Sequence, residues 1–193
     1  MNLPRIVLAS ASPRRKDLLQ QEGYEVVIAV SGVEELEFST EGPAFLALEN
    51  ARLKWRPVAR QYPDLPVVAA DTVVWLGGQF FGKPKDMLDA RRMLAELSGK
   101  THSVVTGVVA GKKGKFTEFA ETSLVTFRDL SEEEIRTYLN DIHPLDKAGA
   151  YAAQNDEGRI IQKIDGLLSN VIGLPVERLR PLWSGETIGG NSR

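Results

Sequence analysis

The sequence predicts an α/β domain with a mixed, twisted sheet, on three observations. Helix-type and strand-type patterns alternate irregularly along 193 residues, enough for one domain or one two-lobed domain with a sizeable core. Residues 66–76, PVVAADTVVWL, form a near-continuous apolar run, typical of a strand buried on both faces of a sheet. Residues 101–111 and 116–127 are β-rich and joined by the turn-like KKGK, which predicts an antiparallel hairpin. A purely parallel sheet is therefore disfavoured.

Five helices are expected among these strands, each starting at a proline in the first helical position or after an Asp or Ser N-cap. They begin at Pro13, Pro43, Met87, Glu132 and Pro175. Ser131 and Glu134 form a capping box in front of the fourth helix, and Gly23 and Gly99 stop the first and third. Pro57 should end or kink the second helix, because proline lacks the N–H that the helix interior needs.

Three short strands complete the expected sheet. RIVLAS, residues 5–10, and EVVIAV, residues 25–30, precede the long apolar run, and the second of them leads into an acidic loop at residues 31–42. QFF, residues 79–81, would fold back on the end of the long run through a Gly-Gly turn.

The stretch GGQFFGKP, residues 77–84, differs from a phosphate-binding P-loop at its last position. Gly77, Gly82 and Lys83 fall where G-x-x-x-x-G-K-[ST] requires them, but Pro84 replaces the hydroxyl residue that would contact Mg²⁺. Pro84 also disfavours a helical conformation at Lys83. The segment is therefore not a P-loop. Lys83 is either a solvated surface charge or a cation offered to phosphate from a strand end.

Arg14 and Arg15 lie in the first turn of the first helix, where the helix dipole is already positive. Each such charge is unfavourable by roughly 0.3–1 kcal/mol at an exposed site. A bound anion would reverse the sign, because free backbone N–H groups, hydroxyls and guanidinium groups would all point toward it. The alternative is that both arginines extend into solvent.

Carboxylates stand at two informative places. Asp71 interrupts the long apolar run, which is costly unless the carboxylate is paired, hydrogen-bonded or bound to a metal. Glu34, Glu35 and Glu37 form a cluster in the acidic loop that could hold Mg²⁺. The alternatives are a strand end at which Asp71 accepts backbone N–H groups, and a solvated acidic loop. Taken with the arginines, these groups indicate a nucleotide phosphate site with chemistry at phosphorus.

Composition argues against several other classes of protein. The chain has no cysteine, which excludes disulfides and thiolate sites and fits a cytoplasmic location. His102 and His143 are too isolated for a zinc site or a catalytic triad. No apolar stretch approaches the length of a membrane span, and a net charge of −2 without a basic stripe disfavours an RNA-binding module. The expected partner is a small molecule, with neither nucleic acid nor membrane.

Six motifs cover most of the chain, from about residue 8 to residue 179: SASPRRKDLL, GVEE, AADTVV, GKPKD followed by DARRMLAELSGKTHSVVTGV, LDKAGAYAAQ, and NVIGLP. Their order and spacing resemble those of the Maf family of nucleoside triphosphate pyrophosphatases. The resemblance implies one elongated, two-lobed α/β domain over residues 1–184, with a central cleft and a fold of the Maf/Ham1-like type, similar to the inosine triphosphate pyrophosphatases. It also implies a homodimer. Residues 185–193 are expected to form a flexible tail.

Members of this family hydrolyse the α–β phosphoanhydride of nucleoside triphosphates to a monophosphate and pyrophosphate, with a divalent metal cation, Mg²⁺ or Mn²⁺. By resemblance, Glu35 and Asp71 would hold the metal, and Asp71 would also take a proton from the attacking water. Lys83 would neutralise charge on the phosphates. The substrate-binding residues implied by the motifs are Ser10, Ser12, Arg14, Arg15, Asn50, Thr72 and Gln154.

The combination of SPRR, ADT and GAY-x-x-Q resembles the branch that acts on dTTP and UTP and so removes unwanted nucleotides, including modified pyrimidines. The alternatives are a 7-methyl-GTP pyrophosphatase and a nucleotide-binding regulator of septum formation without catalysis. One departure stands out. Where the family typically has Glu-Lys-Ala with a functional lysine, this chain has Glu49-Asn50-Ala51. Lys54, one helical turn further on the same face, is a candidate replacement.

Overall fold

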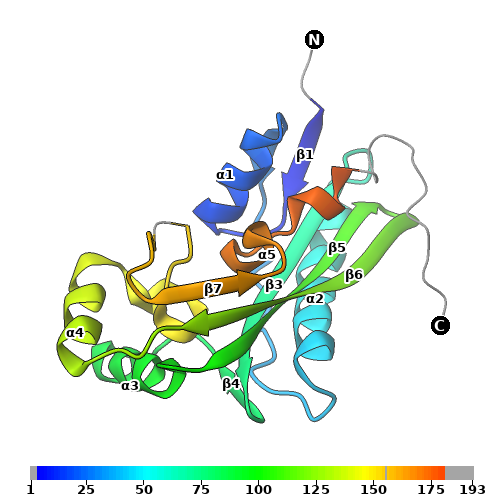
Figure 1. The fold of residues 1–193 in the computed structure, drawn as a ribbon. Coiled ribbons are helices and arrows are strands. Elements are labelled where there is room, and N and C mark those ends of the chain that lie inside the picture. The colour runs from blue at the N-terminus through cyan, green and yellow to red at the C-terminus, as the bar shows by residue number, and fades with distance from the viewer. Residues whose placement is uncertain (1–3, 155, 181–193) are drawn as a thin grey trace.

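The computed structural model describes residues 4–154 and 156–180, and its centre is a seven-stranded sheet (Figure 1). The strands are β1 (Arg5–Leu8), β2 (Glu25–Ile28), β3 (Val67–Leu76), β4 (Gln79–Phe81), β5 (Thr101–Lys112), β6 (Lys115–Phe127) and β7 (Ile161–Asp165). Their order is β2-β1-β3-β5-β6-β7, with β4 paired to the end of β3. β1 is parallel to β2 and β3, whereas all other pairs are antiparallel. The expectation of a mixed sheet is confirmed.

Among the described residues there are five α-helices, and the first four begin where the capping signals placed them. They are α1 (Pro13–Gln21), α2 (Pro43–Gln61), α3 (Met87–Leu97), α4 (Glu132–Asp141) and α5 (Leu168–Ile172), with 3-10 turns η1 (Pro144–Asp146), η2 (Ala148–Ala150) and η3 (Val176–Arg178). Ser12, Asp86 and Ser131 each accept a hydrogen bond from the first turn of the helix that follows. Among the residues described, none of the helices combines the length and the apolar character that crossing a bilayer requires.

Of the two outcomes expected at Pro57, an end of the second helix is wrong, and a kink there stays a prediction. α2 does not end at Pro57 but continues to Gln61. Val58 and Ala59 of that last part are buried against the sheet, and their packing offsets the backbone hydrogen bond that proline cannot make. The stretch in which a helix was expected from Pro175 begins, within the described residues, with the 3-10 turn η3, and the rest of that stretch lies outside them. The sequence also gave no expectation for α5, because five residues are too few to show helical periodicity.

The strand β3 is covered on both faces, as its apolar run predicts. Val67 and Ala69 belong to a buried cluster beneath α2, together with Trp55. Val68 and Ala70 belong to a second cluster on the opposite face, beneath α1 and the C-terminal segment, residues 174–180. Because side chains alternate along a strand, the next two residues of β3 also point to opposite faces: Asp71 points toward α2, and Thr72 points toward α1. This alternation sets the two sides of the site described below.

A third buried cluster lies at the other end of the molecule, where α3 and α4 pack against the ends of β5 and β6 (Figure 1). Its largest buried side chains include Phe81, Leu94, Leu97, Phe127 and Leu139. Long strands β3, β5 and β6 connect this end to the end that carries α1, β1 and β2, so the molecule is elongated (Figure 1). One two-lobed domain over residues 1–184 stays a prediction, and the expected tail at residues 185–193 lies outside the described residues.

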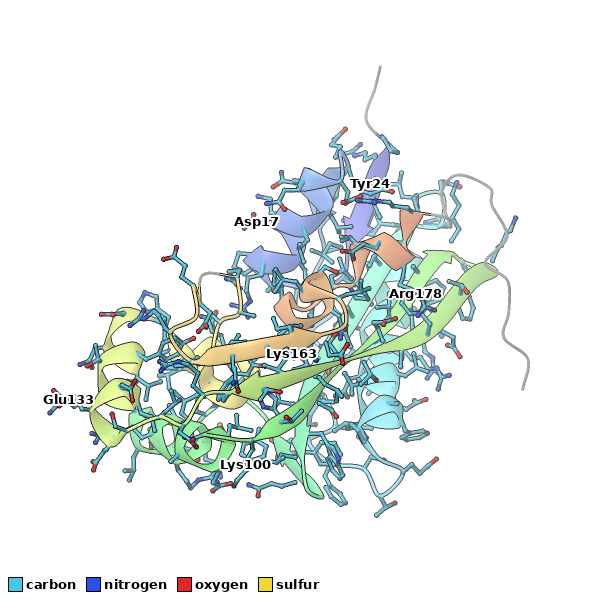
Figure 2. All side chains as sticks on the ribbon, viewed as in Figure 1. Asp17, Tyr24, Lys100, Glu133, Lys163 and Arg178 are labelled. Carbon is cyan, nitrogen blue, oxygen red and sulfur yellow. The ribbon has the colours of Figure 1, made fainter. Side chains whose placement is uncertain are left out.

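The C-terminal segment returns across the sheet and packs onto β6. Arg178 lies beside this strand (Figure 2), with its guanidinium carbon 4.4 Å from the centre of the Phe119 ring. It also pairs with Glu121, while Leu174 and Leu179 are buried in the cluster beneath α1. These contacts fix the chain around α5 next to the first turn of α1.

Candidate active site

A cleft of about 410 Å³ opens where β1 ends and β3 continues past it. Its walls come from the β1–α1 turn, the acidic loop, the middle of β3, the segment after β4 and residues 146–154. The predicted site residues in its lining are Ser10, Ser12, Arg14, Arg15, Glu35, Asp71, Thr72, Lys83 and Gln154. Of the glutamates in the acidic loop, Glu35 faces the cleft, whereas Glu34 and Glu37 are exposed residues outside its lining. Cations and carboxylates distant in sequence thus share one hollow.

Arg15 is a buried cation held by neutral partners. Its Nε donates to the Gly173 carbonyl at 2.8 Å, Nη1 donates to Ser10 Oγ at 3.1 Å and Nη2 donates to Thr72 Oγ1 at 3.1 Å. Among the described residues no carboxylate forms an ion pair with it, and burial lowers the pKa of its guanidinium. A buried positive charge without a paired carboxylate, on the wall of a cleft, is suited to bind an anion.

A chain of buried hydroxyl and amide groups fixes Thr72 behind Arg15. Thr106 Oγ1 donates to the Asn170 carbonyl at 3.1 Å, so its hydrogen is used and Thr72 Oγ1 donates to it across 2.9 Å. The Asn170 side-chain amide in turn donates to the Val104 carbonyl at 3.0 Å. This chain ties α5 to β5 and thereby orients Arg15. Sequence reasoning missed Thr106, whose only signal is a polar residue within the apolar run at residues 104–110 of β5.

Asp71 points to the other face of β3, where α2 supplies two partners one helical turn apart. Lys54 Nζ lies 2.8 Å from Asp71 Oδ1 and 2.7 Å from Glu35 Oε2. Asn50 Nδ2 donates to Asp71 Oδ2 at 3.0 Å and also to the Leu36 carbonyl at 2.9 Å, while the Leu36 N–H donates to Asn50 Oδ1 at 2.7 Å. Asn50 is buried behind Asp71 and outside the cleft lining. It therefore fastens the acidic loop to α2 beside Asp71.

The electrostatics keep Asp71 ionised at neutral pH. Burial alone would raise the pKa of its carboxyl, but the charges of Lys54 and Arg15 and the hydrogen bonds from Lys54 and Asn50 outweigh burial and lower it. An ionised, buried carboxylate with lone pairs left over can accept a proton or bind a cation.

Gly107 makes these contacts possible. It is the residue of β5 paired with Asp71, and a Cβ placed on it would lie 2.4 Å from the carbonyl carbon of Ala47 in α2. Only glycine lets the helix backbone approach the sheet this closely. The approach brings Asn50 and Lys54 onto Asp71. Sequence reasoning did not single out this residue, although a glycine inside a strand is a known sign of close backbone approach.

The remaining walls carry more cations. Arg14 Nη1 donates to Asp146 Oδ2 at 3.0 Å and Nη2 to the Asp146 carbonyl at 3.3 Å, across 132 residues of sequence. Lys147, also in the lining, pairs with the same carboxylate. Lys83 is exposed just past β4 and, among the described residues, has no hydrogen-bond or ion-pair partner. The Gly77-Gly78 turn before β4 has positive φ at both residues, so the hairpin predicted in place of a P-loop is confirmed.

The donor set fits a divalent metal cation that is completed by substrate. No group of three or more histidine, cysteine, aspartate or glutamate side chains that could hold a metal occurs in the described part of the chain. Mg²⁺ typically takes one or two carboxylates, with the remaining positions filled by phosphate oxygens and water. Glu35 and Asp71 supply two carboxylates. Both contact the Lys54 ammonium, so the two carboxylates are close enough to share one cation.

The fold is similar to that in "The structure of the Staphylococcus aureus Ham1 protein", with a TM-score of 0.52 and 17% identity, covering 95% of this chain and 100% of that chain. A likeness at this identity concerns the fold alone. The expectation of a Maf/Ham1-like fold with a mixed, twisted sheet is therefore confirmed.

Relatives with higher identity cover nearly the whole chain. The dTTP/UTP pyrophosphatase of Akkermansia muciniphila is 42% identical over 183 residues, which are 95% of this chain and 97% of the relative. That of Bacillus cereus is 43% identical over 178 residues, 92% of this chain and 88% of the relative. The family model described as "Maf-like protein" matches residues 5–185. The chain, with its cleft of opposed cations and carboxylates, belongs to the Maf family.

Proposed function

We propose that the protein is a metal-dependent nucleoside triphosphate pyrophosphatase. It hydrolyses the α–β phosphoanhydride of dTTP and UTP, and of modified pyrimidine triphosphates, and releases a monophosphate and pyrophosphate. The observation that carries the proposal is the placement of Arg15, a buried cation that has no carboxylate partner among the residues described, in the same cleft as the ionised carboxylate of Asp71. The relatives named dTTP/UTP pyrophosphatase support the choice of nucleotide.

The triphosphate is bound by the cationic wall. Arg15 has N–H groups beyond the three that its neutral partners use, and these would donate to phosphate oxygens. The start of α1, capped by Ser12, adds the positive end of a helix dipole. Lys83, which has no partner among the described residues, would neutralise charge on the pyrophosphate as it leaves. Gln154, at the exposed edge of the cleft, would contact the base.

The carboxylate wall carries the chemistry at phosphorus. Glu35 and Asp71 would hold Mg²⁺ or Mn²⁺, which neutralises phosphate charge and makes a bound water more acidic. Asp71, which is ionised at neutral pH, would accept the proton of the attacking water. Asn50 holds one Asp71 oxygen and the acidic loop in place, so that Glu35 stays beside Asp71.

A screen of triphosphates tests this function. Purified protein is incubated with dTTP, UTP, CTP, ATP and 7-methyl-GTP, with Mg²⁺, Mn²⁺ or EDTA, and released pyrophosphate is measured. Pyrophosphate release from dTTP and UTP that EDTA abolishes is the expected result. Release from 7-methyl-GTP alone, or nucleotide binding without any release, would instead support one of the two alternatives, the 7-methyl-GTP enzyme or the regulator. The expected homodimer and cytoplasmic location stay predictions; light scattering on the purified protein tests the first.

A further inference from the structure

Lys54 is an ammonium group enclosed by two carboxylates at the base of the cleft. Its Nζ lies 2.7 Å from Glu35 Oε2 and 2.8 Å from Asp71 Oδ1, and 3.5 Å from the carbonyl oxygen of Ala70. The residue is only 8% exposed, although it belongs to the cleft lining. Lys54 therefore takes the position of a cation that joins the two carboxylates.

The charges around Lys54 explain why a cation is needed there. Glu35 and Asp71 come from separate parts of the chain, the acidic loop and β3, and both carboxylates contact the same ammonium. Without a positive charge between them, two carboxylates brought this close would repel each other, and Asp71 is buried, which makes repulsion stronger. Arg15 also acts on Asp71, but among the described residues it forms no ion pair with either carboxylate.

We infer that Lys54 is an internal placeholder cation, which keeps Glu35 and Asp71 together in the free enzyme and competes with the divalent metal for their oxygens. This inference rests on the proposed function, because metal binding at this pair is part of that function. A divalent cation bound between these carboxylates would lie close to the ammonium, and because the two positive charges repel each other, it has to displace the ammonium from at least one carboxylate.

Nucleotide relieves this competition. Lys54 faces the cleft in which the polyanion is bound, so an ammonium displaced from the carboxylates has phosphate charge to interact with. Metal and nucleotide therefore favour each other's binding, and the coupling is reciprocal. Lys54 thus acts as a positioning residue: metal binds weakly to the free enzyme and firmly only when the triphosphate is present.

Manganese binding to the nucleotide-free protein tests the inference. The full chain is titrated with Mn²⁺, and the free ion is followed by electron paramagnetic resonance, for the wild type, Lys54→Met and Lys54→Gln. Both neutral variants are expected to bind Mn²⁺ about tenfold or more tightly than the wild type, because the competing charge is gone. Lys147→Met removes a different cleft cation, paired with Asp146, and should leave the affinity within about twofold of the wild type, because screening weakens more distant charges.

Two further measurements keep the test decisive. Lys54→Gln retains a hydrogen-bond donor toward Asp71, so a neutral variant with a supported carboxylate is available if Lys54→Met unfolds. Adding Glu35→Gln to Lys54→Met should remove the gain in Mn²⁺ affinity, which locates the ion at this pair. In the wild type, a non-hydrolysable UTP analogue should strengthen Mn²⁺ binding more than it does in Lys54→Met.

Failure of the inference differs from failure of the proposed function. Equal or weaker Mn²⁺ binding by folded Lys54→Met and Lys54→Gln, with metal-dependent pyrophosphate release intact in the wild type, overturns only the role of Lys54. Undiminished pyrophosphate release by the wild type in EDTA overturns the metal-dependent function, and the inference with it.

Discussion

Asp71 and Gly107 are paired across the β3–β5 ladder, and the missing side chain of Gly107 is what lets α2 reach Asp71. A Cβ on Gly107 would lie 2.4 Å from main-chain atoms of Ala47 and Leu48. The same close approach puts Asn50 and Lys54 in contact with the Asp71 carboxylate. The carboxylate wall of the site therefore depends on a backbone contact as well as on polar side chains.

Gly107→Val is expected to disrupt both fold and site. The added side chain meets backbone, which cannot move aside as a flexible side chain would, so α2 must shift away from β3 and carry Asn50 and Lys54 with it. We expect a loss of about 1–3 kcal/mol in the free energy of unfolding, measured in urea, and a lower turnover number. Gly82→Ala, where a Cβ would meet open space, is the control and should change stability by less than about 0.5 kcal/mol. Equal stability of the two variants would show that the contact is not tight.

Thr106→Val should loosen Arg15 without touching the cleft directly. The substitution keeps the side-chain shape but removes the hydroxyl that links Thr72 to the Asn170 carbonyl. We expect about 1–2 kcal/mol of lost stability and a severalfold increase in KM for the triphosphate, with a smaller effect on kcat. Thr101→Val is the matched control. Thr101 lies on the same strand as Thr106, and its exposed hydroxyl forms a hydrogen bond with Thr126 on β6. An unchanged KM in Thr106→Val would contradict the positioning of Arg15 by this chain of bonds.

His102 makes the stability of the protein sensitive to acid. Burial lowers its pKa to about 4, and one ring nitrogen lies 3.0 Å from the Tyr151 hydroxyl. The unfolded chain, with an ordinary pKa near 6.5, binds a proton that the folded protein excludes, so stability falls as the pH drops from about 6.5 toward 4. The full loss is about 3 kcal/mol.

Unfolding in urea at pH 7, 5.5 and 4.5 measures this loss, with His102→Phe as the comparison. The variant lacks the titrating group, so its stability should change less over that interval. Asp71, Asp146 and Glu22, whose pKa values are lowered, lose their contributions as the pH falls from the ordinary carboxyl pKa values of 3.8 to 4.5 toward their lowered ones. Parallel pH profiles for the two proteins would rule out His102 as the origin.

Asp146→Asn should free Arg14 for the substrate. In the structure Arg14 donates to the Asp146 carboxylate and carbonyl. Removing the negative charge of Asp146 weakens the pairing with Arg14. It also removes an anion from the wall of the cleft in which the triphosphate is bound. We expect a KM for the triphosphate that is lower by about two- to fivefold and a stability change below about 1 kcal/mol, since the pair is partly exposed. Asp141→Asn, from an exposed pair outside the cleft lining, is the control. A higher KM in Asp146→Asn would mean that the Arg14–Asp146 pair itself shapes the site.

Much of the fold was predictable because its signals are local. The cap residues Ser12 and Ser131 and the Gly77-Gly78 turn act within a few residues of themselves, and each lies where the sequence placed it. α2 continued past Pro57 because burial of the following turn, a tertiary effect, outweighed the local rule. α5 was missed because it is held by its contacts with β5 and β6 and not by its own periodicity.

The site was predictable as a set of charges but not as a set of partners. The motifs identified five charged residues of the cleft lining: Arg14, Arg15, Glu35, Asp71 and Lys83. They could not show that Lys54 joins Glu35 to Asp71 or that Arg15 is held by Thr72 and Gly173. Those partnerships depend on how closely α2 and α5 pack on the sheet. Packing distance is set by residues such as Gly107, whose effect appears only in three dimensions.

The most direct test of the account is pyrophosphate release from dTTP and UTP by Asp71→Asn, set beside its nucleotide binding. The amide cannot accept the proton of the attacking water, so turnover should fall by about 10²–10⁴-fold. Binding of the triphosphate in the presence of Mn²⁺ should persist, because Arg15 and Lys83 are unchanged. Turnover near that of the wild type would contradict the assignment of Asp71 as the proton acceptor.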